Sequence, residues 1–164
     1  HKLRDLILDG ITTEELDSKY DYSSITDMSY MFCGCESLET IPLLETSKVT
    51  NMEGMFSDCT SLKTIPLLNT SNVTDMIGMF SCCESLKTIP LLETSNVNDM
   101  SHMFEWCNSL ETIPSIDTSK VTDMRFMFSG CCNLVNIDPY NFDNYDFSNI
   151  KSSFFKEKYP ELFI

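Results

Sequence analysis

An exact internal repeat of 24 residues constrains this 164-residue chain more than any other feature. The repeat runs without insertion or deletion from Cys35 to Gly130. A constant period with fixed apolar positions predicts that equivalent side chains stack coil upon coil, which is the arrangement of a solenoid. The columns predicted to form this structural ladder are Phe32, Phe56, Phe80, Phe104 and Phe128, and Cys35, Cys59, Cys83, Cys107 and Cys131.

Each repeat divides into two halves with different patterns. Residues 37–44 read S-L-E-T-I-P-L-L, and this short segment rich in Leu, Ile and Thr predicts a strand. In residues 46–56, apolar side chains stand at i, i+3, i+6 and i+7, which predicts a short helical turn. Thr46 and its equivalents then occupy the positions of N-caps. The predicted fold is an α/β repeat with one short strand and one short helical turn per coil.

The N-terminal segment, residues 1–21, is predicted to be a helical cap on the first coil. Leu3, Leu6 and Ile7 share one face of a helix. Thr12 and Glu15 have the spacing of a capping box at the start of a second helix. Open solenoid ends expose apolar columns, so a cap of this kind is expected.

The repeats themselves occupy residues 22–137, and the pattern degrades over residues 138–164. We interpret this last segment as a degenerate repeat followed by a C-terminal cap. Phe147, Ile150 and Phe154 are expected to take the core positions that Val121, Met124 and Phe128 hold in the preceding coil, after an insertion of two residues.

Charge and hydropathy exclude several classes of function. The net charge is −14, which opposes binding to nucleic acid and to anionic lipid surfaces. Hydrophobic residues make up 42% of the chain, too many for a disordered acidic segment. No apolar run approaches the roughly 18–20 residues that span a bilayer, so no direct membrane insertion is expected.

The cysteine column is the first candidate site. Its spacing is not that of a zinc site and no histidine accompanies it, so no metal or other cofactor is predicted. Stacked sulfurs in neighbouring coils could pair as disulfides, but packing as buried free thiols is favoured. Cys33, Cys82 and Cys132 lie off the column, at positions where other coils have polar residues, and are expected to be exposed. The vicinal pairs Cys82–Cys83 and Cys131–Cys132 leave soft-metal binding or a strained bridge as an alternative.

Two adjacent columns vary most between coils, and we predict that they contact a partner. Variation at fixed positions of a rigid repeat is where binding specificity can be encoded. The predicted partner-binding residues are Glu53, Ile77, Ser101 and Arg125 in one column, and Tyr30, His102 and Phe126 in the other.

A column of acidic residues is the last candidate site, and the sequence contains no catalytic motif. Asp75, Asp99 and Asp123 could bind Ca²⁺ along one edge, but capping by each Asp of its own helical turn is favoured. His102 is the only internal histidine, and no nucleophile elbow, phosphate-binding loop or zinc-protease motif occurs. The sequence therefore predicts no catalytic residues and no enzyme activity.

The string Met55-Phe56-x-x-Cys59-x-x-Leu62-x-x-Ile65 resembles the BspA-like leucine-rich repeats of bacterial surface proteins. The segment T-S-N-V-T-D-M, residues 70–76, is similar to a mycoplasma-type surface lipoprotein repeat, a family of unknown function. The resemblance covers residues 22–137. It implies a right-handed, leucine-rich-repeat-like solenoid in a secreted or surface-anchored protein, with adhesion as the proposed role.

These observations together predict a non-enzymatic repeat protein that binds a protein or glycan partner through its solenoid surface. We expect an extracellular or cell-surface protein that is a monomer or associates weakly with itself, with a phage particle or the cytoplasm as other locations. The alternative is a structural spacer or oligomerisation module, for example in a phage particle.

Overall fold

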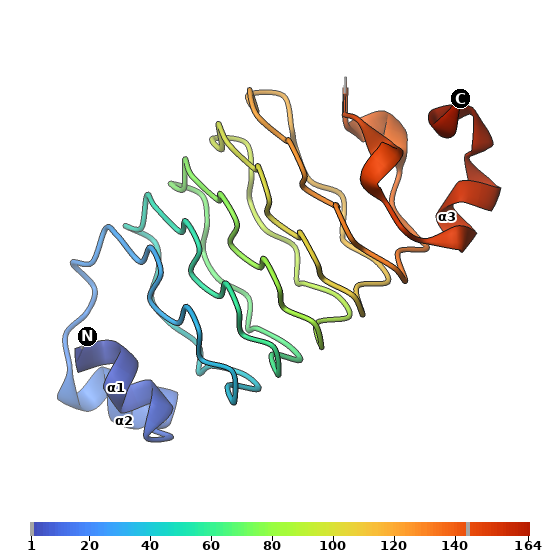
Figure 1. Ribbon diagram of the computed structural model, residues 1–164. Helices are drawn as coiled ribbons and strands as arrows, with labels where there is room; N and C mark the ends of the chain where they lie inside the picture. Colours follow the sequence, from blue (N-terminus) through green and yellow to red (C-terminus); the bar gives the residue numbers. More distant parts are fainter. Residues whose placement is uncertain (1, 144) are drawn as a thin grey trace.

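The computed structural model describes residues 2–143 and 145–164, which form a stack of coils between two helical ends (Figure 1). Among these residues, two helices precede the first coil, and three short 3₁₀ helices and one α-helix follow the last one. Their bounds are α1 Lys2–Leu8, α2 Thr13–Lys19, η1 Pro139–Asn141, η2 Phe147–Asn149, α3 Ser153–Lys158 and η3 Pro160–Phe163.

Linked turns form the coils, so the predicted strand and helical turn are both wrong. Residues 37–44 hold no strand, and residues 46–56 hold no helix. In the second half of the coil, four-residue turns close from Thr46 to Val49 and from Met52 to Met55. Such turns bring residues three apart to the same side, and this is the spacing from which a helix was predicted. Among the described residues, four parallel bridges between coils lie at the acidic column: Asp27–Asn51, Asn51–Asp75, Asp75–Asp99 and Asp99–Asp123. A fifth joins Thr112 to Asn136 in the first half of the coil.

A ladder of main-chain hydrogen bonds joins each coil to the next. The N–H groups of Met28 and Tyr30 donate to the carbonyls of Asn51 and Glu53, at 3.0 and 2.8 Å. Every second residue from 28 to 34 donates in this way to the residue 23 positions later, and the next three coils repeat the pattern. The ladder leaves main-chain groups of the inner coils paired, which burial requires.

The threonine column also joins coils, so its predicted role as N-caps is wrong. Thr46, Thr70 and Thr94 are buried, and each hydroxyl donates at 2.9 Å to a carbonyl of the following coil. Without a helix there are no helical N–H groups to cap. The residue before each threonine stabilises the turn instead. In the first of these turns, Glu45 Oε1 accepts a hydrogen bond from the N–H of Ser47 at 2.8 Å.

The acidic column stabilises local turns. Asp27 Oδ1 accepts from the N–H of Ser29, and Asp99 Oδ1 from the N–H of Ser101, each at 2.8 Å. In turns, Asp and Asn side chains commonly accept a hydrogen bond from the main-chain N–H two residues later, as they do here. The favoured capping role is therefore present, at turns rather than at helices.

Phenylalanine rings and thiols run through the core as two columns. The five rings from Phe32 to Phe128 are fully buried and stack nearly parallel, with neighbouring centroids 5.5–5.7 Å apart. The cysteines beside them are free thiols. The Sγ of Cys59 donates to the carbonyl of Phe32 at 3.1 Å, and the next three cysteines repeat this contact at 3.1–3.2 Å. The thiols therefore fill space and also bond to the preceding coil.

Thiol reactivity should separate the column from the remaining cysteines. Burial raises the pKa of Cys59 and of Cys131 to about 12, which suppresses the reactive thiolate. We expect a disulfide reagent to label Cys33, Cys82 and Cys132 in the native protein, because they are partly buried or exposed, and all eight thiols in denaturant. Fewer than eight thiols in denaturant would instead indicate disulfides.

The N-terminal cap has the local structure expected from its sequence. Leu3 and Ile7 of α1 are buried. The Thr12 side chain accepts from the N–H of Glu15 at 3.3 Å, and the Glu15 carboxylate accepts from the N–H of Thr12 at 3.2 Å. The capping box that starts α2 is therefore present.

The C-terminal cap differs from prediction at one core position. Phe154 is 53% exposed, whereas Phe155 is fully buried, so the expected core role of Phe154 is wrong. The reason is that Ser152 starts α3: its hydroxyl accepts from the N–H of Phe155 and donates to the carbonyl of Leu134. The Ser152 anchor therefore directs the ring of Phe155, rather than that of Phe154, into the core.

Candidate functional site

Each coil contains two positions with a left-handed backbone. They are the third residues of successive four-residue turns, closed for example from Met28 to Met31 and from Phe32 to Cys35. A turn with positive φ at its third residue favours glycine there. The first left-handed column holds Tyr30, Gly54, Gly78, His102 and Phe126, and the second holds Gly34, Asp58, Cys82, Trp106 and Gly130.

Four of these positions carry aromatic residues, which define the aromatic face: Tyr30, His102, Trp106 and Phe126. Their φ angles are 53–60°, a conformation that costs a residue with a Cβ roughly 1–2 kcal/mol. The neighbouring positions 28, 31, 32 and 35 and their equivalents face the core, so the left-handed residues project from the opposite side. Tyr30, Trp106 and Phe126 are 51%, 41% and 44% exposed.

Two aromatic rings cover a glycine of the following coil. A Cβ at Gly54 would collide with the ring of Tyr30, and a Cβ at Gly130 would collide with the ring of Trp106. The Tyr30 hydroxyl donates to Glu53, and this hydrogen bond raises the pKa of Tyr30 to about 12. The glycine that follows Tyr30 and the glycine that follows Trp106 in their columns therefore leave room for these two rings.

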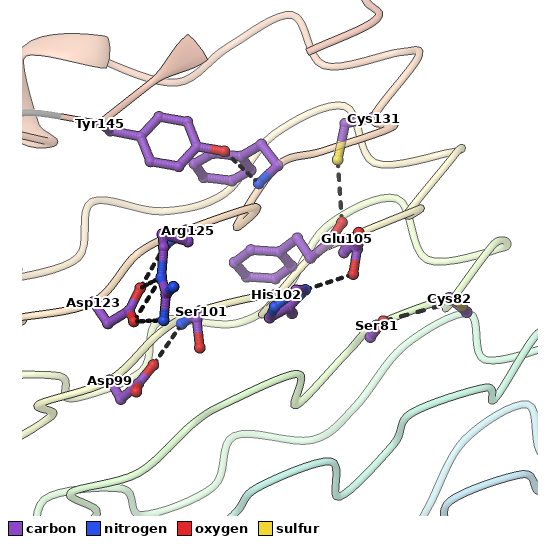
Figure 2. Close-up of polar contacts among 12 residues, drawn as sticks. Ser81, Cys82, Asp99, Ser101, His102, Glu105, Asp123, Arg125, Cys131 and Tyr145 are labelled. Carbon is purple, nitrogen blue, oxygen red and sulfur yellow. Dashed lines mark hydrogen bonds and ion pairs between the residues drawn. The ribbon is translucent and has the colours of Figure 1, made fainter. Parts of the chain in front are cut away.

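His102 and Phe126 stack on each other in neighbouring coils. Their ring centroids are 5.2 Å apart. Figure 2 shows the polar contact of His102, whose Nδ1 lies 2.7 Å from Glu105 Oε2. Beside Phe126, Arg125 donates to both carboxylate oxygens of Asp123, with Nη2 at 2.6 Å from Oδ2. Hydrogen bonds from the side chain and N–H of Arg125 hold the pKa of Asp123 below its ordinary value.

Lys151 brings a cation from the C-terminal cap onto the aromatic face. Its Nζ lies 4.3 Å from the centroid of the Trp106 ring, within cation–π range. Apolar rings, carboxylates and cations therefore lie together where the last coils meet the cap. Such a surface can stack on an apolar group and hydrogen-bond to its polar edge.

The structure places the predicted partner-binding residues differently. Tyr30, Phe126 and Arg125 are exposed, and Glu53, Ile77 and His102 are partly buried. Ser101 is only 6% exposed, so its side chain offers little surface to a partner. Its short side chain lies in the column between the longer Ile77 and Arg125.

Sequence reasoning missed Trp106. The variable columns from which partner contacts were predicted do not include its position. The available signal was that the single tryptophan of the chain stands in the column of Gly34 and Gly130. A bulky ring at a position that accepts glycine calls for a reason other than turn formation.

Metal-binding clusters and membrane-spanning helices are both absent from the part of the chain that the structure describes. Within residues 2–143 and 145–164, no three His, Cys, Asp or Glu side chains converge so as to hold a metal ion. Within the same ranges, no helix has the length and apolar character to cross a bilayer.

Comparison with solved structures supports a leucine-rich-repeat fold. A leucine-rich repeat protein of T. pallidum is 24% identical with a TM-score of 0.53, covering 72% of this chain and 54% of its own. One from Eubacterium ventriosum is 20% identical with a TM-score of 0.54, covering 79% and 32%. A leucine rich cell surface protein from Faecalibacterium prausnitzii is 26% identical with a TM-score of 0.50, covering 70% and 36%. The chain thus matches about half or less of each of these proteins.

The sequence also matches a family model, described as "Mycoplasma protein of unknown function, DUF285", over residues 8–112 and 63–160. No curated protein matches the chain. These comparisons indicate no enzymatic family, and they confirm the resemblance to bacterial surface leucine-rich repeats. From the repeat, the coil geometry and this match, the chain belongs to the mycoplasma-type DUF285 family.

Proposed function

We propose that this protein is a non-enzymatic recognition module that binds a protein or glycan partner through the aromatic face. The observation that carries the proposal is the placement of aromatic residues at left-handed positions where sister coils have glycine. Each such residue costs stability. Phe126 remains 44% exposed, so burial in the free protein offsets only part of that cost. A bound partner would complete the burial.

The chemistry of the face suits a ligand with both apolar and polar groups. Tyrosine, tryptophan and arginine are the residues that dominate the energetic centres of interfaces. Here the rings of Trp106 and Phe126 offer flat apolar surface, while Glu105 and Arg125 place charged groups beside them. A sugar ring or an aliphatic side chain could stack on the rings and hydrogen-bond to the charges.

We place this function at the bacterial surface. The F. prausnitzii protein, 26% identical to this chain, is described as a leucine rich cell surface protein. Repeat proteins commonly use such extended surfaces for binding. A surface location would expose the aromatic face to protein or glycan partners of other cells.

Glycine substitutions give a direct test, because they remove rings without straining the turns. A glycan array and a panel of purified extracellular proteins would be probed with the wild-type chain and with the triple variant His102→Gly, Trp106→Gly and Phe126→Gly. We expect the triple variant to lose at least about tenfold in affinity for the ligand identified, as hot-spot residues do. Its turns should persist, since glycine is preferred at positive φ.

The matched control is Asp58→Gly, which makes the same backbone change in the second left-handed column without removing a ring. This variant should bind as the wild type does. A ligand whose affinity is the same for the wild-type and triple-variant chains would contradict the proposed surface.

A stripe of exposed leucines favours the second candidate, a spacer or oligomerisation module. Leu43, Leu67 and Leu91 occupy one column and are 52%, 64% and 57% exposed. Contiguous exposed apolar residues mark interaction sites. Light scattering over a concentration series separates the two functions, because a spacer self-assembles without a ligand.

A further inference from the structure

The hydrogen-bond ladder stops abruptly over part of the last complete coil. In the preceding coils, the N–H groups of Met100 and His102 donate to Asp123 and Arg125, both at 2.9 Å. The equivalent N–H groups one coil later belong to Met124 and Phe126. Neither has an acceptor among residues 2–143 and 145–164.

In the same coil, a column of carbonyl groups that accept hydrogen bonds from the following coil also comes to an end. The carbonyl of Asn98 accepts from the N–H of Thr122 at 2.8 Å, and that of Thr50 accepts from the N–H of Thr74 at 2.9 Å. The carbonyl of Thr122 has no donor among the described residues. Residues 122–126 thus present one acceptor followed by two donors at the spacing of the ladder.

The C-terminal cap completes only the other half of this edge. The N–H of Phe128 donates to the hydroxyl of Tyr145 at 2.8 Å, and the N–H of Gly130 donates to the carbonyl of Asn149 at 3.1 Å. The cap therefore substitutes for a further coil at residues 128 and 130. Residues 122–126 are left without that substitute.

A groove of about 550 Å³ lies over these uncapped residues, which we call the end groove. Its coil wall is residues 121–126, and its cap wall includes Asp143, Tyr145 and Asp146. Figure 2 shows Tyr145 on one side and Arg125 with Asp123 on the other. The volume is that of a site for a small ligand or a short peptide.

We propose that the end groove binds an extended peptide segment carrying a basic side chain, which continues the ladder in parallel register. Within the protein, residues 74–77 pair with residues 50–54 in this way. Thr74 N–H donates to Thr50, while the carbonyls of Asp75 and Ile77 accept from the N–H groups of Met52 and Gly54 at 3.0 and 2.7 Å. An incoming peptide would make the same three bonds to Thr122, Met124 and Phe126. Exposed ladder edges bind peptides by this addition of main chain.

The acidic residues of the end groove favour a basic side chain in the bound peptide. In the ladder, the residue equivalent to Asp75 would lie beside Asp123, the last member of the acidic column. The groove also contains Asp143 and Asp146, and the basic residue among its described lining, Arg125, is engaged with Asp123. A lysine or arginine at that position of the peptide therefore meets three carboxylates and one cation.

The cap determines the size of the occupant. Tyr145 and Asn149 already occupy the edge at residues 128 and 130, so a complete coil of a second copy has no access to the whole ladder. A short segment needs only the uncapped residues. The end groove binds the peptide through main-chain groups of the last coil, whereas the aromatic face binds its partner through side-chain rings.

The probe is a blocked heptapeptide, N-V-T-K-M-I-G, which is residues 72–78 with lysine in place of Asp75. It would be titrated to millimolar concentration into the isotope-labelled wild-type protein and followed by NMR. We expect saturable downfield shifts of the Met124 and Phe126 amide protons, together with slower hydrogen exchange at both. The amides of Met100 and His102 already have acceptors and should not move.

Two peptides control for the register and the charge. The natural sequence N-V-T-D-M-I-G should bind at least about tenfold more weakly, because its carboxylate faces Asp123. The lysine peptide with an N-methyl group on its threonine should not bind, because it cannot donate to Thr122.

Three results would overturn the proposal. One is the absence of shifts at Met124 and Phe126 with the lysine peptide. Another is equal binding of the N-methylated peptide. A third is shifts that depend on protein concentration without peptide, which would assign the groove to a second copy of the chain.

Discussion

Replacing Phe80 with alanine should lower the free energy of unfolding by about 3–5 kcal/mol, the usual cost of deleting a buried aromatic ring. The Phe80 ring is fully buried and stacks between Phe56 and Phe104, with centroids 5.6 Å from each. Its loss leaves a cavity in the middle of the column. Because each coil is stabilised mainly by its neighbours, a central defect weakens the coupling of both halves.

Chemical denaturation of the wild type and of Phe80→Ala measures this effect. Leu67→Ala is the matched control, since Leu67 lies on the neighbouring coil surface and is 64% exposed. The control should change stability by less than about 0.5 kcal/mol. A loss below about 1 kcal/mol in Phe80→Ala would show that the phenylalanine column does not hold the coils together.

Phe155→Ala should release the C-terminal cap while the central coils stay folded. Phe155 is fully buried, with ring centroids 5.6 Å from Phe147, 4.9 Å from Tyr159 and 6.3 Å from Phe163. Its removal should cost the cap about 3–5 kcal/mol, as for other buried rings. A terminal defect frays one end of a linear array, because distant coils do not contact it.

Hydrogen exchange read residue by residue distinguishes local from global loss. Protection should fall at the amides of η2 and α3 and persist at Phe56 and Phe80. Phe154→Ala is the control, because Phe154 is the adjacent residue of the same helix and is 53% exposed. Equal loss of protection in all coils would mean that the array unfolds as one unit.

Several features could be predicted from the sequence because they depend on residue type and spacing alone. The 24-residue period places Phe80 and Cys83 in register with their equivalents. In the structure, the Phe80 ring stacks on that of Phe56, and the Cys83 thiol donates to the Phe56 carbonyl. The capping box of Thr12 and Glu15 is local, so its pattern sufficed. The family resemblance needed only the repeated string.

Other features could not be predicted because different backbones share one pattern. Apolar residues three apart fit both a helix and a series of turns, and the choice depends on hydrogen bonds to the next coil rather than within the segment. The positive φ at Tyr30 and Trp106 is set by those turns. The variation of its column predicted a partner contact for Tyr30, but the variable columns did not include Trp106.

The period, the buried columns and the acidic surface follow from the amino-acid sequence, since each is a matter of which residue recurs and how often. The aromatic face and the end groove follow from tertiary contacts. The ring of Trp106 contacts Gly130 and Lys151. The Tyr145 hydroxyl accepts the hydrogen bond of the Phe128 N–H that a following coil would otherwise accept. Met124 and Phe126 keep free N–H groups within the described chain. These pairs are 17–45 residues apart, so only the folded chain brings them together.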